Sequence, residues 1–180
     1  MHPAFKGALV AMIAALGAGC ATTQSAAPPR RRAATAEANR VKLAVLPVES
    51  DLWPRASREL NRQLRDVHVS GIDDYFLSKV TLEVVQLSIE CVEPSPTCYA
   101  AVGKSLTAQR LLIAQLQPGK GTPHHPHVHL TITLFDVEAG QAVNVVDRYF
   151  KNESETVAGI SALLDEATRP STGGGARASK

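Results

Sequence analysis

Hydrophobic spacing changes regularly along the chain, and each change predicts a strand or a helix. Short apolar runs with little alternation occur at Lys42–Glu49 and Arg110–Leu116, and such runs are typical of strands covered on both faces. Alternation over Val128–Leu134 predicts a half-buried strand, with Ala142–Phe150 as its hairpin partner. Tyr75–Val80 predicts one more strand, which brings the expected sheet to about five strands.

Two segments have the spacing of amphipathic helices. In Asp51–Val67 one side is apolar and the other is basic, with Trp53, Leu60, Leu64 and Val67 opposite Arg55, Arg58, Arg62 and Arg65. Asp51 is placed to cap this helix, and Pro54 is tolerated in its first turn. The second helix begins at Asn152, which is expected to form a capping box with Glu155, and its apolar stripe is Val157, Ile160, Leu164 and Ala167.

The middle of the chain predicts a pair of shorter helices. Leu82–Cys91 fits both a strand and a helix, and Thr81 as a cap favours the helix. Tyr99–Leu106 predicts the second helix, whereas Val69–Asp74 and Gln117–His125 have the Gly, Asp and Pro residues of loops. The resulting order β-α-β-α-α-β-β-β-α predicts an α/β (α+β) fold, in which helices pack on a small mixed sheet.

Residues 1–20 have the order of a secretory signal, with Lys6, the apolar core Ala8–Leu16 and small residues before Cys20. Because the Cys directly follows Gly17-Ala18-Gly19, the segment resembles a bacterial lipoprotein signal. In that family the Cys becomes the first mature residue and carries acyl chains such as palmitate. The family usually has a large apolar residue where this chain has a glycine three positions before the Cys. An ordinary cleaved signal peptide and a bare membrane anchor are the alternatives.

This interpretation divides the chain into four parts. We expect a signal peptide at 1–19, the lipidated Cys and a flexible tether at 20–41, a periplasmic α/β domain at 42–167 and a disordered polar tail at 168–180. By the sorting rule of lipoproteins, Ala21 after the Cys directs the protein to the outer membrane, facing the periplasm.

Composition argues against a nucleic-acid partner. The formal net charge is +2 and aromatic residues make up 4% of the chain, so neither a strong basic field nor a base-stacking surface is expected. After the signal no apolar run reaches the length of about 20 residues that a membrane-spanning helix needs.

Cys91 and Cys98 enclose a short loop that contains Pro94 and Pro96. In an oxidising periplasm this pair is expected to close as a structural disulfide that joins the end of one helix to the start of the next. A redox pair and half of a metal site are the alternatives, although a redox pair usually has two intervening residues.

Gly103-Lys104-Ser105 resembles the end of a phosphate-binding loop, but the place of the required earlier glycine is held by Cys98. We therefore expect no nucleotide. Gly103 is better explained by close helix packing, and Lys104 by solvation.

Four histidines, His124, His125, His127 and His129, lie close together. His127 and His129 are expected on the same side of a strand, about 7 Å apart. Two imidazoles suit Zn²⁺, Cu²⁺ or Ni²⁺, and His124 or His125 can supply a further ligand from the loop. The alternative is a solvated loop without metal.

No nucleophile and base stand in a recognisable arrangement. His68 is isolated, and the acidic pairs Asp73-Asp74 and Glu153/Glu155 are better explained as turn and helix-start residues. The sequence therefore predicts no catalytic residues.

Three stretches together carry a resemblance to a known group: KLAVLPVES with the helix after it, SLTAQRLLIAQL, and the hairpin VHLTITLFDVEAGQAVNVV with its turn Asp136–Gly140. They resemble the α/β domain of the TolB amino-terminal and curli-secretion lipoprotein group, of which myxobacteria have variants with a Cys pair. The resemblance covers about residues 42–167. It implies a mixed sheet with helices packed on it and a role in envelope assembly or scaffolding, by analogy of fold.

The function we expect is that of a non-enzymatic, lipid-anchored outer-membrane protein whose domain binds an envelope protein or a second copy. The exposed edge of the sheet is the expected docking place. The alternative is a periplasmic metal-binding lipoprotein that uses the His124–His129 cluster. An enzyme ranks third.

Overall fold

The computed structural model describes residues 40–72, 74–91, 93–122 and 125–169 of the chain. Its elements follow the predicted order: β1 (Lys42–Val45), α2 (Pro54–Leu64), β2 (Asp74–Leu77), α3 (Leu82–Ser88), α4 (Pro96–Ser105), β3 (Arg110–Thr122), β4 (His125–Asp136), β5 (Gln141–Phe150) and α5 (Glu153–Thr168). None of these described helices is long and apolar enough to cross a membrane. The predicted signal, the lipidation site, residues 20–39 of the predicted tether and residues 170–180 of the predicted tail lie outside the described residues.

The sheet has five strands in the order β2-β1-β3-β4-β5. β1 pairs in parallel with β2 and β3, whereas β3, β4 and β5 form an antiparallel meander. The sheet is therefore mixed, as the sequence predicts. Its two edges differ, because β2 has four residues and β5 has ten.

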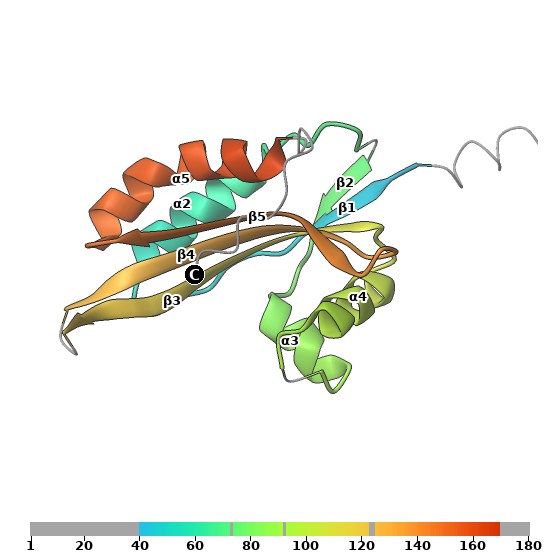
Figure 1. Ribbon diagram of the computed structural model, residues 1–180, viewed down its shortest axis with the longest axis horizontal. Coiled ribbons are helices and arrows are strands. Elements are labelled where there is room, and N and C mark those ends of the chain that lie inside the picture. The colour runs from blue at the N-terminus through green and yellow to red at the C-terminus, as the bar shows by residue number, and fades with distance from the viewer. Residues whose placement is uncertain (1–39, 73, 92, 123–124, 170–180) are drawn as a thin grey trace, which may run out of the picture.

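Helices α2 and α5 lie side by side over one face of the sheet (Figure 1). Alternate side chains of four strands meet the apolar stripes of both helices there, and the fully buried members include Leu43, Val45, Leu60, Leu64, Leu112, Leu130, Ile132 and Ile160. The predicted stripes of both helices are confirmed, and the four arginines of α2 and its flanks are exposed. This layer follows the long strands over much of their length.

Helices α3 and α4 cover the opposite face, but only near one end of the sheet (Figure 1). Their core includes Leu82, Val85 and Val102, which pack against Ala44, Leu46, Leu111, Ile113 and Phe135 of the sheet. The helix favoured for the ambiguous Leu82–Cys91 segment is confirmed, since Leu82 and Val85 are buried on one side of α3. Thr81 is the N-cap residue, but its side chain makes no capping hydrogen bond.

The disulfide between Cys91 and Cys98 joins the region after α3 to the first turn of α4, with 5.7 Å between the two Cα atoms. Ser95 caps α4, because its hydroxyl accepts a hydrogen bond from the backbone N–H of Cys98 at 3.2 Å. The buried Gln86 amide also donates to Sγ of Cys98. The link therefore fixes the two helices of the smaller layer to each other.

The prediction that Asp51 caps α2 is wrong. The N-cap residue is Trp53, which provides no side-chain hydrogen bond. Glu153 of α5 supplies the missing acceptor, because its Oε1 accepts hydrogen bonds from the backbone N–H groups of Arg55 and Ala56 at 2.6 and 3.0 Å. A carboxylate at this place satisfies free N–H groups and complements the helix dipole. The two helices are thus joined at their amino-terminal ends.

The start of α5 largely agrees with the predicted capping box. Asn152 Oδ1 accepts from the backbone N–H of Glu155 at 2.9 Å. The Glu155 carboxylate reaches back to the N–H of Lys151, one residue earlier than a standard box. Both contacts hold the chain as it leaves β5.

The loop predicted at Gln117–His125 is mostly strand. β3 continues to Thr122 and pairs with β4, with an irregularity between Pro118 and Gly121. The irregular register accommodates Pro and Gly residues that would normally end a strand. As a result, the β3–β4 hairpin extends well past the end of the smaller helical layer.

Candidate functional site

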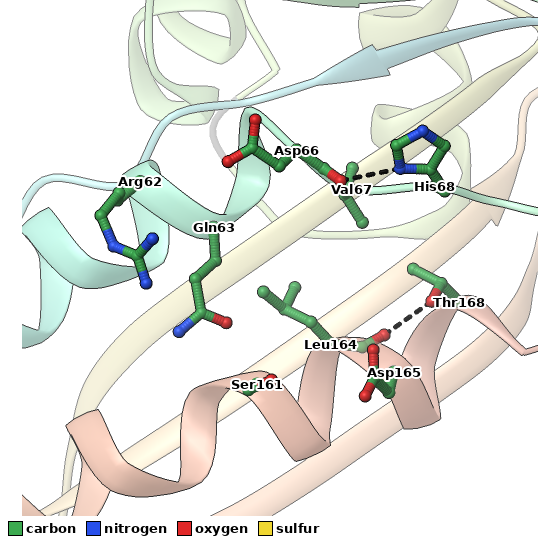
Figure 2. Close-up of a pocket in the computed structure, with 9 residues that line it drawn as sticks. All are labelled: Arg62, Gln63, Asp66, Val67, His68, Ser161, Leu164, Asp165 and Thr168. Atoms are coloured by element: carbon green, nitrogen blue, oxygen red, sulfur yellow. Dashed lines mark hydrogen bonds between the residues drawn. The ribbon is translucent and has the colours of Figure 1, made fainter.

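A groove of about 500 Å³ lies between the carboxyl-terminal ends of α2 and α5. Figure 2 shows side chains from both helices along it, including Arg62 and Gln63 on one side and Ser161 and Asp165 on the other. His68, which the sequence left isolated, lies at one end.

Most polar groups of the groove are occupied by neighbours in their own segment. Arg62 and Gln63 both donate to the carboxylate of Glu59, and the hydrogen bond from Arg62, followed by that from Gln63, lowers the pKa of Glu59 to about 2. His68 donates from Nδ1 to the backbone carbonyl of Asp66 at 2.8 Å, because a carbonyl can only accept. The groove therefore offers little that is arranged for a ligand.

Gly103 lies inside α4, so no phosphate-binding loop forms around Lys104 and Ser105. A β-carbon built on Gly103 would overlap Cγ2 of Val137 and lie 2.9 Å from its Cγ1. The expectation of close helix packing at this glycine is confirmed, and Lys104 is exposed.

A more distinctive surface lies beyond α3 and α4, on the sheet face opposite α2 and α5. We call it the open face and define it by the described side chains that the strand register places there: Gln115, Gln117, His129, Thr131, Thr133, Val145, Asp147 and Tyr149. They form three rungs across the sheet, in which His129 lies opposite Tyr149, Thr131 opposite Asp147 and Thr133 opposite Val145. Val145 is 52% exposed and Tyr149 is 61% exposed, so large side chains are presented to solvent.

His129 is held in place by three neighbours. Its Nε2 donates to Oδ1 of Asp147 at 2.7 Å, and the hydroxyl of Thr131 lies 3.4 Å from the same nitrogen. Its ring stacks on Tyr149, with the ring centres 4.2 Å apart and the planes 2° from parallel. These contacts fix the imidazole and the phenol ring as one unit.

This cluster lacks the geometry of a catalytic relay. A nucleophile–histidine–acid relay uses both imidazole nitrogens, one toward the acid and one toward the nucleophile. Here Asp147 and Thr131 both meet Nε2. The arrangement orders the surface but does not activate the threonine hydroxyl.

Tyr149 reaches across β4 toward β3. A β-carbon built on Gly119 would lie 3.0 Å from Cδ1 of Tyr149 and 3.3 Å from the carbonyl oxygen of His127. The glycine therefore leaves the room that the tyrosine ring needs. Beside the ring is a cavity of about 350 Å³, lined by Lys120, His127 and Tyr149.

The structure brings together only part of the predicted histidine cluster. His127 and His129 both belong to β4, two positions apart. The described residues include no group of three or more potential ligands close enough to hold a metal ion. His124 and the side chain of His125 lie outside the described part of the chain, so metal binding by His124, His125, His127 and His129 stays a prediction.

The outer edge of β5 borders the open face. β5 is the last strand of the sheet, and among the described residues no strand pairs with its outer side. Arg148 and Asn144 connect it to α5, through the carboxylate of Glu166 at 3.3 Å and the carbonyls of Glu166 and Ala167. These contacts fix the strand to α5.

Comparison with known proteins finds likeness at the level of structure only. No protein-family model matches the chain, and no curated protein sequence matches it. Similar solved structures include the LpoB C-terminal domain from Salmonella enterica, with 16% identity over 62% of this chain and 83% of that one and a TM-score of 0.40. Lipoprotein GNA1162 from Neisseria meningitidis has 12% identity over 69% and 96%, also with a TM-score of 0.40.

TolB from Acinetobacter baumannii is similar as well, with 14% identity over 71% of this chain and 27% of that one and a TM-score of 0.37. The similar structures thus include TolB and lipoproteins, in line with the resemblance noted in the sequence. At TM-scores below 0.5 this likeness carries no argument about function, which has to come from the surface of the chain itself.

Sequence reasoning missed the contact between His129 and Asp147. The Asp136–Gly140 turn alone does not reveal this contact, because the register shifts by one residue between Leu134 and Phe135. Only the shifted register sets His129 opposite Tyr149 and brings Asp147 to the same face.

Proposed function

We propose that this domain is a non-catalytic binding module of the cell envelope, which contacts another protein through the outer edge of β5. The partner supplies an extended segment that pairs with β5 and continues the sheet. Main-chain hydrogen bonds then give affinity, and side chains of the open face give specificity.

The observation that carries the proposal is the difference between the two sheet edges. β2 is too short to template a long pairing, and very short edge strands are one way in which proteins protect an edge. β5 offers ten residues, and its Val145 is 52% exposed. A long edge with an exposed apolar residue is the kind of surface that a strand from a partner can cover.

The same strand has features that limit unspecific pairing. Asp147 and Arg148 place two charges in it, and the register shifts between Leu134 and Phe135 of the neighbouring strand. Charges and irregular register are devices that protect edges from aggregation. His129 and Glu166 already pair with these two charges, so a partner strand must fit beside them, which makes the edge selective.

Anchoring by acyl chains on Cys20 completes the proposal, with the protein in the outer membrane and its domain facing the periplasm. Support comes from the signal-like order of residues 1–20. Several acyl chains on one residue give a stable anchor, since each buried CH₂ contributes about 0.8 kcal/mol.

The edge is tested by Val145→Lys, because a lysine on an edge strand discourages strand addition. The control is Leu52→Lys, which changes another exposed apolar residue (61% exposed) in the segment before α2. Protein partners that crosslink to the full chain in cells should be lost with Val145→Lys and kept with Leu52→Lys. Equal recovery from both variants would refute an interface at β5.

Anchoring is tested separately by growing cells with radiolabelled palmitate. The wild-type chain should take up the label and remain with the outer-membrane fraction, whereas Cys20→Ala should do neither. Label on the Cys20→Ala chain would contradict the assigned anchor.

A further inference from the structure

The cavity beside Tyr149 is lined in addition by Lys120 and His127, which the definition of the open face does not include. We propose that it binds a saccharide ring that carries a carboxylate, such as a uronic acid unit. Tyr149 supports the ring, and Lys120 and His127 receive the acid group.

The tyrosine ring is pre-arranged for stacking. It is 61% exposed, yet it is held in place by the parallel ring of His129, which Asp147 fixes in turn at 2.7 Å. An exposed aromatic side chain that is already ordered loses little conformational entropy when a ligand packs on it. The flat C–H face of a pyranose is a suitable apolar partner for such a ring.

The position of the tyrosine ring depends on the lack of a side chain at Gly119. Any side chain there would approach the tyrosine ring to within 3.0 to 3.2 Å and would also crowd the backbone of His127. The cavity of about 350 Å³ beside the ring lies at the small end of the range for ligand sites, about 300 to 1,000 Å³. It therefore suits one or two sugar rings better than a large ligand.

The charge of the cavity lining favours a ligand that carries an acid group. The described lining consists of Lys120, His127 and Tyr149, with no carboxylate among them. An ammonium group and an imidazole N–H beside an aromatic ring favour an anion, and a carboxylate can accept from both.

Three probes separate the contribution of the sugar ring to binding from that of the carboxylate: glucuronic acid has both, glucose has only the ring and acetate has only the carboxylate. Each is titrated into the isotope-labelled full chain in detergent with EDTA present, and amide chemical shifts are followed by NMR. Glucuronic acid should bind with a Kd of about 1 mM and at least about tenfold tighter than either other probe. The shifts should centre on Lys120, His127 and Tyr149.

Variants then test the assigned residues. Lys120→Met and Tyr149→Leu should each weaken binding of glucuronic acid about tenfold. Lys151→Met and Tyr75→Leu change an exposed lysine and an exposed tyrosine that do not line the cavity, and they should leave binding within about twofold. The NMR spectrum of each variant shows whether the domain remains folded, and Tyr149→Phe keeps the ring if Tyr149→Leu does not fold.

Several results would overturn the proposal. They are the absence of saturable binding, equal binding of glucose, equal binding of acetate, and shifts centred elsewhere on the domain. Because Val145→Lys leaves the cavity lining intact, it should retain glucuronic acid binding. Failure of the β5 interface and failure of this site can therefore be told apart.

Discussion

The two faces of the sheet are formed by the same strands, but helices cover one face much further along the strands than the other. On one face α2 and α5 cover the long strands, and the alternate side chains beneath them are apolar, as in Leu130 and Ile132. On the other face α3 and α4 cover only the region around Ile113 and Phe135. Past that point the side chains become His129, Thr131 and their neighbours in β5.

This difference shows that the polar side chains of the open face are part of the residue pattern of the strands. Within β4, Val128, Leu130 and Ile132 are fully buried, whereas His129 and Thr131 between them are polar and only partly buried. A domain that needed only stability would gain from apolar residues under a longer second layer.

The largest expected effect comes from Ile132→Ala. Ile132 is fully buried under α5, so its truncation removes apolar contacts and leaves a cavity. The free energy of unfolding should fall by about 3 to 4 kcal/mol in urea titrations. The adjacent Thr131→Ala on the open face should change it by no more than about 0.5 kcal/mol. Similar losses for both variants would contradict the contrast between the faces.

Loss of the disulfide should weaken the smaller helical layer. Because the loop between Cys91 and Cys98 is short, the double variant Cys91→Ala/Cys98→Ala should lower the free energy of unfolding by about 2.5 kcal/mol. Wild-type protein in excess dithiothreitol should lose a similar amount. If the double variant were as stable as the oxidised protein, the disulfide would have no structural role.

Packing of α4 on the sheet is tested by Gly103→Ala. The added methyl group meets the side chain of Val137, so overpacking should cost about 1 to 3 kcal/mol in thermal or urea unfolding. Val137→Ala in the same chain should recover part of that loss, because it removes the overlapping atoms. If the losses in unfolding free energy from the two single changes simply added in the double variant, the contact with Val137 would not be the cause of the Gly103→Ala effect.

The link between α5 and α2 is tested by Glu153→Ala. The change leaves two N–H groups at the start of α2 without their acceptor and should cost about 1 kcal/mol. Glu153→Gln keeps a neutral acceptor and should lose less. Hydrogen exchange at Arg55 and Ala56 should rise first, and unchanged exchange there would argue against the capping role.

The smallest effect concerns Glu59 on the exposed side of α2. Hydrogen bonds from Arg62 and Gln63 lower its pKa from 4.5 to about 2 in the folded chain. A lowered folded-state pKa stabilises the fold above the unfolded pKa, and that contribution is lost as pH falls from about 4.5 toward 2. Glu59→Gln should flatten this part of the stability–pH curve slightly, and added salt should do the same. An identical curve for the variant would show that the pair contributes nothing.

The sequence was sufficient to predict those helices and strands that depend on the pattern of neighbouring residues. The alternation of Val128–Leu134 and the stripe from Val157 to Ala167 predicted their elements because burial follows the local period. The extension of β3 through Pro118 was missed, since Pro and Gly residues normally end strands and only pairing with β4 keeps them in the sheet.

Contacts between distant residues were harder to foresee. Glu153 caps a helix 98 residues earlier in the chain, and no local pattern signals such a contact. The stacking of Tyr149 on His129 depends on hairpin register and on the space at Gly119. The sequence predicted docking at an exposed edge of the sheet, but identifying β2 and β5 as the two edge strands required the strand order.

The central claim is that the β5 edge meets a partner protein, and site-specific photocrosslinking in intact cells tests it most directly. A photoreactive amino acid is placed at Val145 and, in a second strain, at Arg58 on the exposed side of α2. A discrete crosslinked product, the same in repeated experiments, should form from position 145 and not from position 58. A product from position 58 alone, or none from either position, would contradict the account.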